Sequence, residues 1–190
     1  MTDEELVRSL LDAGDDREAA TALLRTYGPV VLRYLRSLLR EEGAVDDAFS
    51  LFAEWAWKGI SRFRGESSLR TWAFGVAWNA ARRVSDEAWQ KRKERLKTSE
   101  ASKLAQEIRA SSALEVDRQA DQLAELRRQL SADEQNLLVL RIDHQLSWDE
   151  IAAVLGSRGE VASAPVLRKR FERLKERIAR LARQRGLGRR

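Results

Sequence analysis

The sequence contains no cysteine, a single histidine and only two prolines among its 190 residues. The lack of cysteine excludes disulfide scaffolds, cysteine-ligated zinc and thiol catalysis. His144 is the only imidazole, so a histidine metal cluster is excluded as well. No apolar run approaches the roughly 20 residues that span a bilayer, and the first ten residues are acidic rather than basic. We therefore expect a cytoplasmic protein without membrane insertion.

Positive charge is unevenly distributed along the chain. The formal net charge is +5, from 35 Lys and Arg against 30 Asp and Glu. Residues 167–190 hold eleven Lys and Arg and two Glu, a net charge of +9, which leaves −4 on all other residues. A basic segment on an acidic body favours contact with a polyanion. A solvated basic helix face explains the charge about equally well.

The pattern of apolar residues is helical throughout. Neither glycine nor proline occurs between Gly75 and Gly156, and no stretch shows the alternation of β-branched residues that strands have. Together with the abundance of Ala, Leu, Arg and Glu, this predicts an all-α protein. Capping boxes, in which a hydroxyl and a Glu three residues later cap a helix start, are predicted for Thr2 with Glu5, Ser131 with Glu134, and Ser147 with Glu150.

The two prolines predict different local structures. Pro165 suits the first turn of a final helix, where its missing N–H costs little. Pro29 lies inside a helical pattern over residues 17–40 and predicts a break or kink near Tyr27 and Gly28.

Composition divides the sequence into two blocks. Residues 16–84 contain four of the six tryptophans and four of the five phenylalanines, whereas residues 130–183 are rich in Leu, Ile and Val. The charged stretch between them has no Gly or Pro, which argues against a simple flexible tether. We predict two small helical domains, residues 1–84 and 130–190, joined by a partly helical linker over residues 85–129.

The second block has the pattern of a helix-turn-helix. Residues 147–156 predict a short helix ending at Gly156, and residues 165–183 predict a longer one with an apolar stripe at spacings of three and four. Its remaining face is basic. The second helix of such a motif enters the major groove, where Arg pairs with guanine and Lys with phosphate. A helical hairpin with a solvated basic face is the alternative, and the connection over residues 157–164 is longer than the usual turn.

Residues 62–83 combine basic and aromatic side chains. Five Arg stand against one Glu, with Phe63, Trp72, Phe74 and Trp78 interleaved. Cationic groups among stacking surfaces are what single-stranded nucleic acid requires. For any one of these aromatic residues taken alone, however, burial in the core is a better interpretation than stacking on a nucleic-acid base.

Two segments resemble the extracytoplasmic-function sigma factors of the sigma-70 family. The chain resembles a variant subgroup of these factors. FRGESSLRTWAFGVAWNAARR is similar to their regions 2.3–2.4, and SADEQNLLVLRIDHQLSWDEIAAVLG followed by LRKRFERLKERI is similar to their region 4. The order of the segments and the linker between them also match. The resemblance implies a bacterial transcription initiation factor with a region 2 helical bundle and a region 4 helix-turn-helix. It would bind core RNA polymerase and direct it to specific promoters.

The resemblance also implies which residues contact promoter DNA. The loop over residues 63–68 and the helix after it would receive the melted −10 element, with a flipped non-template base near residues 64–68. The final helix would read the −35 duplex. The −10 residues would be Phe63, Arg64, Gly65, Glu66, Ser67, Ser68, Trp72, Asn79, Arg82 and Arg83, and the −35 residues Arg168, Lys169, Arg170 and Arg173.

The helix over residues 46–60 would dock on the polymerase. Asp46 and Asp47 match the acidic pair of the family, but Ser50 and Leu51 replace its usual Gln-Glu. Gly75 likewise replaces a position that is commonly basic. Asp46, Ser50 and Glu54 share one helix face because they are spaced four residues apart.

Ser50 is a candidate phosphorylation site. A phosphate would add about −1.5 to −2 charges where the family expects an acid, and could switch polymerase binding on. A neutral surface serine tolerated in a variant subgroup is the alternative.

The partners implied are core RNA polymerase and promoter DNA, both duplex and single-stranded, with an anti-sigma factor or a Ser/Thr kinase as further candidates. No cofactor or metal is expected, and the protein is not expected to be an enzyme. His144 lies in a polar stretch and is expected at the surface. Two alternatives remain: a helix-turn-helix regulator that binds duplex DNA without polymerase, and an interaction protein whose basic helices contact acidic partners.

Overall fold

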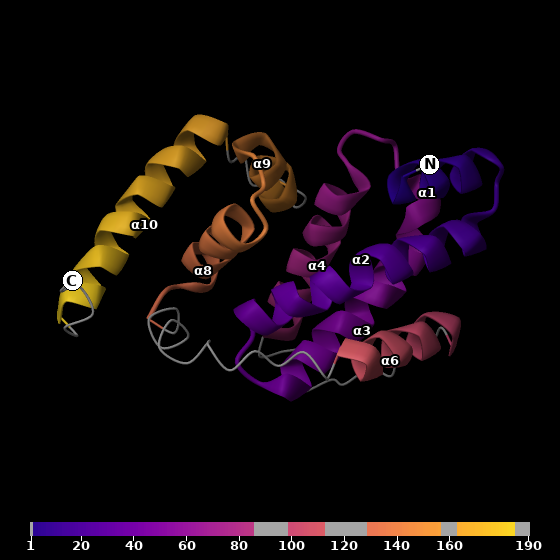
Figure 1. Ribbon diagram of the computed structural model, residues 1–190, viewed down its shortest axis with the longest axis horizontal. Helices are drawn as coiled ribbons and strands as arrows, with labels where there is room; N and C mark the ends of the chain where they lie inside the picture. Colours follow the sequence, from indigo (N-terminus) through magenta and orange to yellow (C-terminus); the bar gives the residue numbers. More distant parts are fainter. Residues whose placement is uncertain (1, 86–98, 113–128, 157–162, 185–190) are drawn as a thin grey trace.

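The computed structural model describes residues 2–85, 99–112, 129–156 and 163–184, and the regular structure within these ranges is helical (Figure 1). The predicted all-α class is confirmed. In chain order the elements are α1 (Asp3–Asp12), α2 (Asp16–Leu38), α3 (Glu42–Gly59), the 3₁₀ turn η1 (Ile60–Arg62), α4 (Leu69–Ser85), α6 (Ser99–Ser112), α8 (Ala132–Leu138), the π-helical turn η3 (Val139–Asp143), α9 (Trp148–Gly156) and α10 (Ala164–Gln184).

Three helices begin with the predicted capping boxes. At the start of α9, Ser147 Oγ accepts from the Glu150 N–H at 3.2 Å, and Glu150 Oε2 accepts from the Ser147 N–H at 2.7 Å. Each pair satisfies two backbone N–H groups that have no partner within the helix. The same arrangement caps α1 through Thr2 and Glu5 and α8 through Ser131 and Glu134.

The prolines lie in α2 and α10. Pro165 occupies the first turn of α10, as predicted. Helix α2, in contrast, runs without a break from Asp16 to Leu38, with Pro29 inside it. Gly28 and Val31 on either side of Pro29 are buried. Because tertiary packing supplies most of the stability of a helix, it maintains α2 across the missing hydrogen bond.

Helices α2, α3 and α4 form the centre of the molecule, and α1 packs against α2. Their contacts bury large aromatic side chains completely, among them Tyr34, Phe49, Phe52 and Phe74. Each such side chain contributes about 1.5–3 kcal/mol by leaving water. The Tyr34 and Phe74 rings meet edge to face with centroids 5.0 Å apart.

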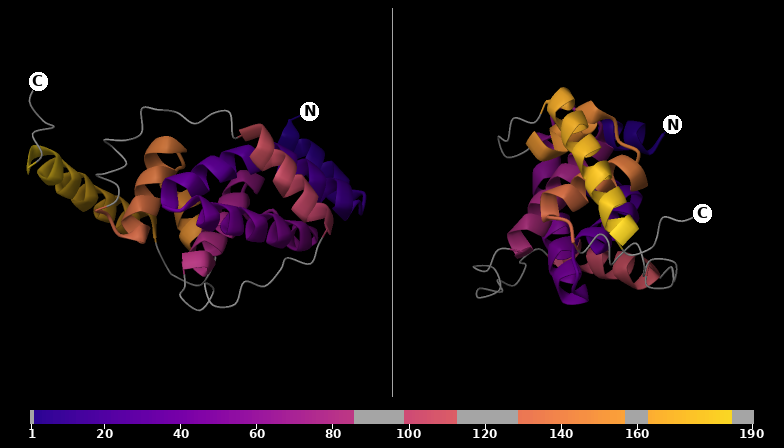
Figure 2. Two further views of the ribbon diagram at one scale, coloured as in Figure 1. Left: turned by 90° about the horizontal axis from the view of Figure 1, so that it is seen from below. Right: turned by 90° about the vertical axis from the view of Figure 1, so that its left-hand side faces the viewer.

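Helix α6 lies against α2 and α3, on the side of the bundle away from α9 and α10 (Figures 1 and 2). Its buried residues Ala101, Leu104, Ala105 and Ile108 recur at helical spacing and join the central core. Part of the predicted linker region is therefore a packed helix.

Helices α8, α9 and α10 form the other end of the molecule (Figure 1). Helix α9 packs on α4, and α10 packs on α9 and α8. Buried residues of α9 and α10, such as Ile151, Val154 and Phe171, belong to the same apolar core as those of α2 and α4. The two predicted blocks thus share one continuous core.

Among the described residues, no helix is both long enough and apolar enough to cross a bilayer.

Candidate nucleic-acid interface

The loop before α4 presents three exposed residues in succession, Arg64, Gly65 and Glu66. Gly65 has a φ of +73°, in the left-handed region that glycine adopts without strain. Ser68 ends the loop by capping α4, because its Oγ accepts from the Thr71 N–H at 3.1 Å and donates to Thr71 Oγ1 at 2.9 Å. Its hydroxyl is thus committed to the helix start. Residues 64–66 are the exposed part of the predicted −10 loop.

Phe63 and Trp72 flank this loop, and both are half-buried. Their rings meet edge to face with centroids 5.8 Å apart. Trp72 also lies over Gly59, where a Cβ would come within 3.3 Å of the indole. One side of each ring therefore packs against the protein while another part reaches solvent next to exposed residues.

The second half of α4 carries the other predicted −10 residues. Asn79 and Arg82 are half-buried and Arg83 is exposed. The Arg82 guanidinium lies 5.8 Å from the ring centroid of Trp78, which is itself buried. Arg82 is therefore held against an aromatic wall, whereas Arg83 is open to solvent.

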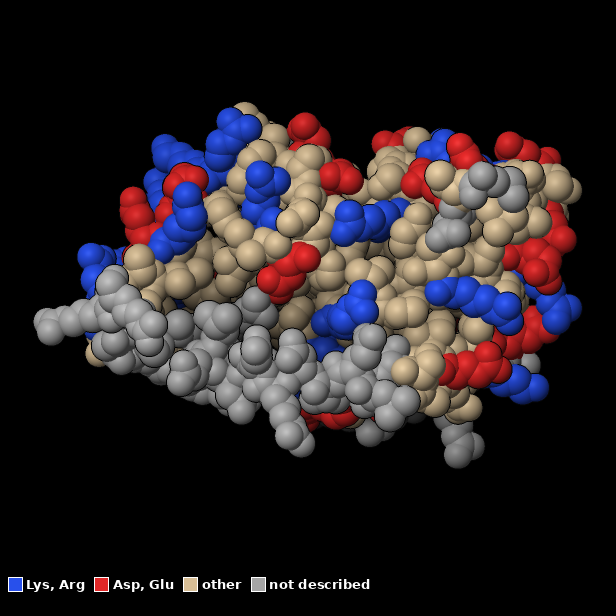
Figure 3. Space-filling model, viewed as in Figure 1, with Lys and Arg blue, Asp and Glu red and all other residues tan. Residues whose placement is uncertain are grey.

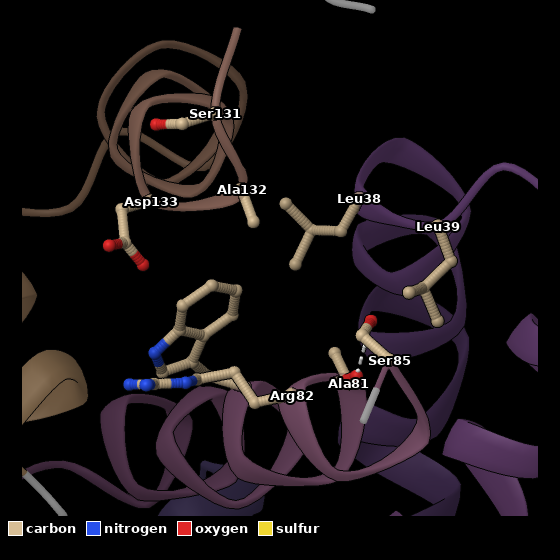
Figure 4. Close-up of a pocket in the computed structure, with 9 residues that line it drawn as sticks. Leu38, Leu39, Ala81, Arg82, Ser85, Ser131, Ala132 and Asp133 are labelled. Atoms are coloured by element: carbon tan, nitrogen blue, oxygen red, sulfur yellow. Dashed lines mark hydrogen bonds between the residues drawn. The ribbon is translucent and has the colours of Figure 1, made fainter. Parts of the chain in front are cut away.

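A cavity of about 300 Å³ lies where the ends of α2 and α4 meet the start of α8. Leu38 of α2, Arg82 of α4 and Asp133 of α8 line it from three sides (Figure 4). It therefore joins residues from both predicted domains, and Arg82 belongs to that junction.

The predicted −35 residues are all exposed on α10. Leu167, Phe171 and Leu174 anchor the opposite face of the helix in the core. Figure 3 shows Lys and Arg gathered over α10 and Asp and Glu gathered at the far end over α1. This arrangement leaves Arg168, Lys169, Arg170 and Arg173 available to a polyanion.

Arg177 departs from the expected outward basic face. It is half-buried, and its Nη1 pairs with Glu134 Oε1 at 2.6 Å. Its Nη2 donates to the Gln129 carbonyl at 3.0 Å. Arg177 therefore attaches α10 to α8.

Burial alone would raise the pKa of the Glu134 carboxyl. Hydrogen bonds from Ser131 and Arg177, with the charge of Arg177, outweigh that effect and lower the pKa below its usual value. Glu134 is therefore ionised in its pair with Arg177.

Hydrogen bonds that sequence reasoning did not find join the two predicted blocks, and besides the bond from Gln135 Nε2 to the Ser37 carbonyl there are three more. Arg70 Nη2 donates to the His144 carbonyl at 2.8 Å, and Thr71 Oγ1 donates to Glu150 Oε1 at 3.4 Å. The third is buried and links Tyr34 Oη to Asn136 Oδ1 at 2.7 Å. None of these pairs is marked by a local motif.

His144 lies in an aromatic cluster and not at the surface, so that expectation was wrong. Its ring centroid is 4.7 Å from that of Phe74 and 5.7 Å from that of Tyr34. Burial, followed by the charges of Arg70 and Arg33, lowers the pKa of His144 to about 4. The imidazole is therefore neutral near pH 7.

The predicted polymerase-docking residues of α3 differ in exposure. Asp46 is exposed, and Asp47 and Ser50 are half-buried. Glu54 is buried, with only 5% of its surface exposed, and pairs with Lys58. The first turns of α3 are therefore the accessible part of this face.

Arg109 of α6 contacts those first turns directly. Its Nη1 donates to Ser50 Oγ at 2.8 Å and to the Asp46 carbonyl at 3.2 Å. Its Nε lies 3.6 Å from Asp46 Oδ1. Sequence reasoning missed Arg109, although the helical spacing of Ala101, Leu104, Ala105 and Ile108 could have revealed an amphipathic helix here.

In the part of the chain that the structure describes, no group of three or more His, Asp or Glu side chains is arranged to hold a metal ion.

The class of protein follows first from the known family that part of the sequence matches. The sequence model of Sigma-70 region 2 matches residues 23–94, which contain most of α2, all of α3, the exposed loop and α4. The helical bundle around the loop is thus a sigma-70-type domain.

A relative extends the similarity beyond that domain. RNA polymerase sigma factor YlaC of Bacillus subtilis (strain 168) is 30% identical over 162 residues, covering 82% of this chain and 90% of YlaC. The chain therefore belongs to the extracytoplasmic-function sigma factors of the sigma-70 family, the DNA-recognition subunits of bacterial transcription initiation. No solved structure matches the chain.

Proposed function

We propose that this sigma factor directs core RNA polymerase to promoters by reading a −35 duplex with α10 and a melted −10 strand with the loop before α4. The observation that supports the division most directly is the exposure of Arg168, Lys169, Arg170 and Arg173 on a helix whose other face is anchored in the core. Because the opposite face holds α10 in the core, the four exposed side chains can enter a DNA groove while the helix stays folded.

The −10 reader is the exposed loop together with α4. Residues 64–66 are open to solvent, and Phe63 and Trp72 offer partly exposed rings beside them. A base that leaves the duplex loses stacking at a cost of a few kcal/mol, which contacts with aromatic rings and polar groups offset. Asn79, Arg82 and Arg83 continue the same path toward the end of α4, where Arg83 is the exposed cation.

The polymerase-docking surface is the N-terminal half of α3. Asp46 and Asp47 supply its negative charge, and Ser50 lies one turn further along the same helix. Ser50 remains our candidate for phosphorylation. A phosphate there would add negative charge for a partner but would also pair with Arg109, which already lies at hydrogen-bonding distance. Polymerase pull-down with Ser50→Ala, Ser50→Glu and the wild type from the native host tests the idea, and equal binding by all three would remove it.

Transcription in vitro tests the proposed function. The full chain is added to core RNA polymerase of the native host on fragmented genomic DNA, and the 5′ ends of the transcripts are sequenced. We expect starts downstream of a shared pair of elements, and these starts should require the chain. A regulator without polymerase docking would neither co-purify with core polymerase nor restore initiation.

A matched pair of variants tests the role of α10. Arg168→Ala with Arg170→Ala should abolish initiation that depends on the −35 element while leaving polymerase binding unchanged. Arg180→Ala with Arg183→Ala removes the same charge from exposed positions further along α10 and should retain initiation. If the first pair also loses polymerase binding, the assignment of α10 to DNA is wrong.

A further inference from the structure

Helix α6 covers part of the surface that the proposed function assigns to the polymerase. It lies along α2 and α3 (Figures 1 and 2). Ala101, Leu104, Ala105 and Ile108 are each no more than 8% exposed, whereas Lys103, Gln106 and Glu107 face solvent. The helix is therefore amphipathic, with its apolar face toward the bundle.

The bundle is shaped to receive this helix. At Gly28 of α2, a Cβ would lie only 2.7 Å from Ile108 Cδ1 and 3.6 Å from Phe49 Cζ. The glycine thus allows the tip of Ile108 to enter between α2 and α3. This close approach shows that α6 occupies a fitted site.

Polar contacts hold the two ends of α6. At its start, Glu100 pairs with Arg17 of α2 at 2.6 Å. Near its end, Arg109 bonds Ser50 and the carbonyl of Asp46 and lies beside the Asp46 carboxylate. The second set of contacts uses the residues that are accessible on the docking half of α3.

We propose that α6 is an internal occupant of the docking surface on α3, which core RNA polymerase must displace. This inference rests on the proposed function, because it takes the N-terminal half of α3 as the docking surface. Arg109 already bonds the Ser50 hydroxyl and lies beside the Asp46 carboxylate, so the polymerase competes with it for these groups. The apolar contact consists of two alanines and two branched side chains, and the ion pairs have exposed members. A larger partner can therefore replace it.

Displacement predicts that tethering α6 blocks docking. Because the chain has no cysteine, Arg17→Cys with Glu100→Cys introduces the only two thiols, at a contact between α6 and α2 that does not involve Asp46 or Ser50. A short bis-maleimide with a reducible disulfide in its spacer then joins α6 to α2. We expect the cross-linked protein to bind core polymerase at least about tenfold more weakly than the untreated double variant, and reduction to restore binding.

The control for the cross-link leaves α6 free. Glu4→Cys with Arg8→Cys places the same chemistry across the i,i+4 ion pair within α1. Binding of this variant to core polymerase should be unchanged by the cross-link.

Release of α6 should have the opposite effect. Ile108→Asp puts a charge on the buried face of α6, whereas Gln106→Asp puts the same charge on its exposed face. We expect Ile108→Asp to tighten polymerase binding about threefold or more, because the competent population increases, and Gln106→Asp to leave it unchanged. Circular dichroism of both variants verifies that the bundle stays folded.

The outcomes separate this inference from the proposed function. Unchanged polymerase binding by the tethered protein would overturn the inference alone, as would equal binding by Ile108→Asp, Gln106→Asp and the wild type. If neither the wild type nor Ile108→Asp binds core polymerase, and neither supports promoter-dependent initiation, the proposed function is overturned together with the inference.

Discussion

His144 places a neutral imidazole between the two halves of the molecule. Its ring packs on Phe74 of α4 and on Tyr34 of α2, and its carbonyl accepts from Arg70. A protonated ring here would lose hydration and lie near two arginines, which is why the pKa of His144 is lowered to about 4.

Stability should therefore decrease with acid through His144. In the unfolded chain the imidazole has a pKa near 6.5, so between pH 6.5 and about 4 the unfolded state binds more protons than the folded one. The free energy of unfolding is then largest above pH 6.5 and decreases as the pH falls through this window. Urea denaturation at pH 7.5, 6.5, 5.5 and 5.0 measures the decrease, and His144→Gln should flatten it. An equally steep decrease in His144→Gln would contradict the prediction.

The Tyr34–Asn136 hydrogen bond is the buried polar contact at the same junction. Burial raises the pKa of Tyr34, so the phenol stays protonated and donates to Asn136 Oδ1. Tyr34→Phe leaves that buried oxygen without its donor and should lower the free energy of unfolding by about 1–3 kcal/mol. Tyr34→Phe with Asn136→Leu removes both polar partners and should cost less than the two single changes together. Urea denaturation of Tyr34→Phe, of Asn136→Leu and of the double variant measures these costs. A fully stable Tyr34→Phe protein would contradict the assignment.

At the scale of the elements, α9, the first helix of the helix-turn-helix, packs this motif against the bundle. It packs on α4 on one side and α10 on the other. Burial by itself would raise the pKa of the Glu150 carboxyl, but hydrogen bonds from Ser147 and Thr71 and the charge of Arg70 outweigh it and lower the pKa. The ionised Glu150 thus caps α9 and bonds α4 at once.

Removing the cap should destabilise α9 and its contact with α4. Ser147→Ala eliminates the hydroxyl that accepts from the Glu150 N–H and should cost about 1 kcal/mol. Ser61→Ala, at an exposed position in η1, is the control and should be close to neutral. Thermal denaturation followed by circular dichroism compares the two. Equal melting temperatures would show that the capping box contributes nothing.

At the scale of the whole molecule, the apolar core runs from α1 and α2 through α4 to α10. Two independently folding domains would each have a core of their own. Here the predicted boundary between residues 84 and 130 is crossed by buried apolar contacts as well as by the Tyr34–Asn136 bond. The helices that the structure describes are therefore packed into one body across this boundary.

Such a body should unfold cooperatively. Calorimetry of the full chain should show one transition whose calorimetric and van't Hoff enthalpies agree. Tyr34→Phe should shift that transition as a whole, because the bond joins both halves. Two resolved transitions, only one of which moves in Tyr34→Phe, would contradict a shared core.

The sequence by itself determined the all-α class, three capped helix starts, the two-faced character of α10 and the family. These features depend on neighbours within about one helix turn or on contiguous motifs such as FRGESSLRTW, so no knowledge of distant residues is needed. The exposure of Arg168 and Arg170 followed from the apolar stripe that includes Leu167, Phe171 and Leu174.

Only the tertiary structure decided which side chains of these elements are buried and which distant residues they contact. His144 looks solvent-exposed among polar neighbours, but Phe74, 70 positions earlier, covers it. Arg109 meets Ser50 across 59 positions, and Tyr34 meets Asn136 across 102. Contacts of this kind depend on which helix faces pack together, and packing is a property of the whole chain. Such packing places α6 over the predicted docking face of α3.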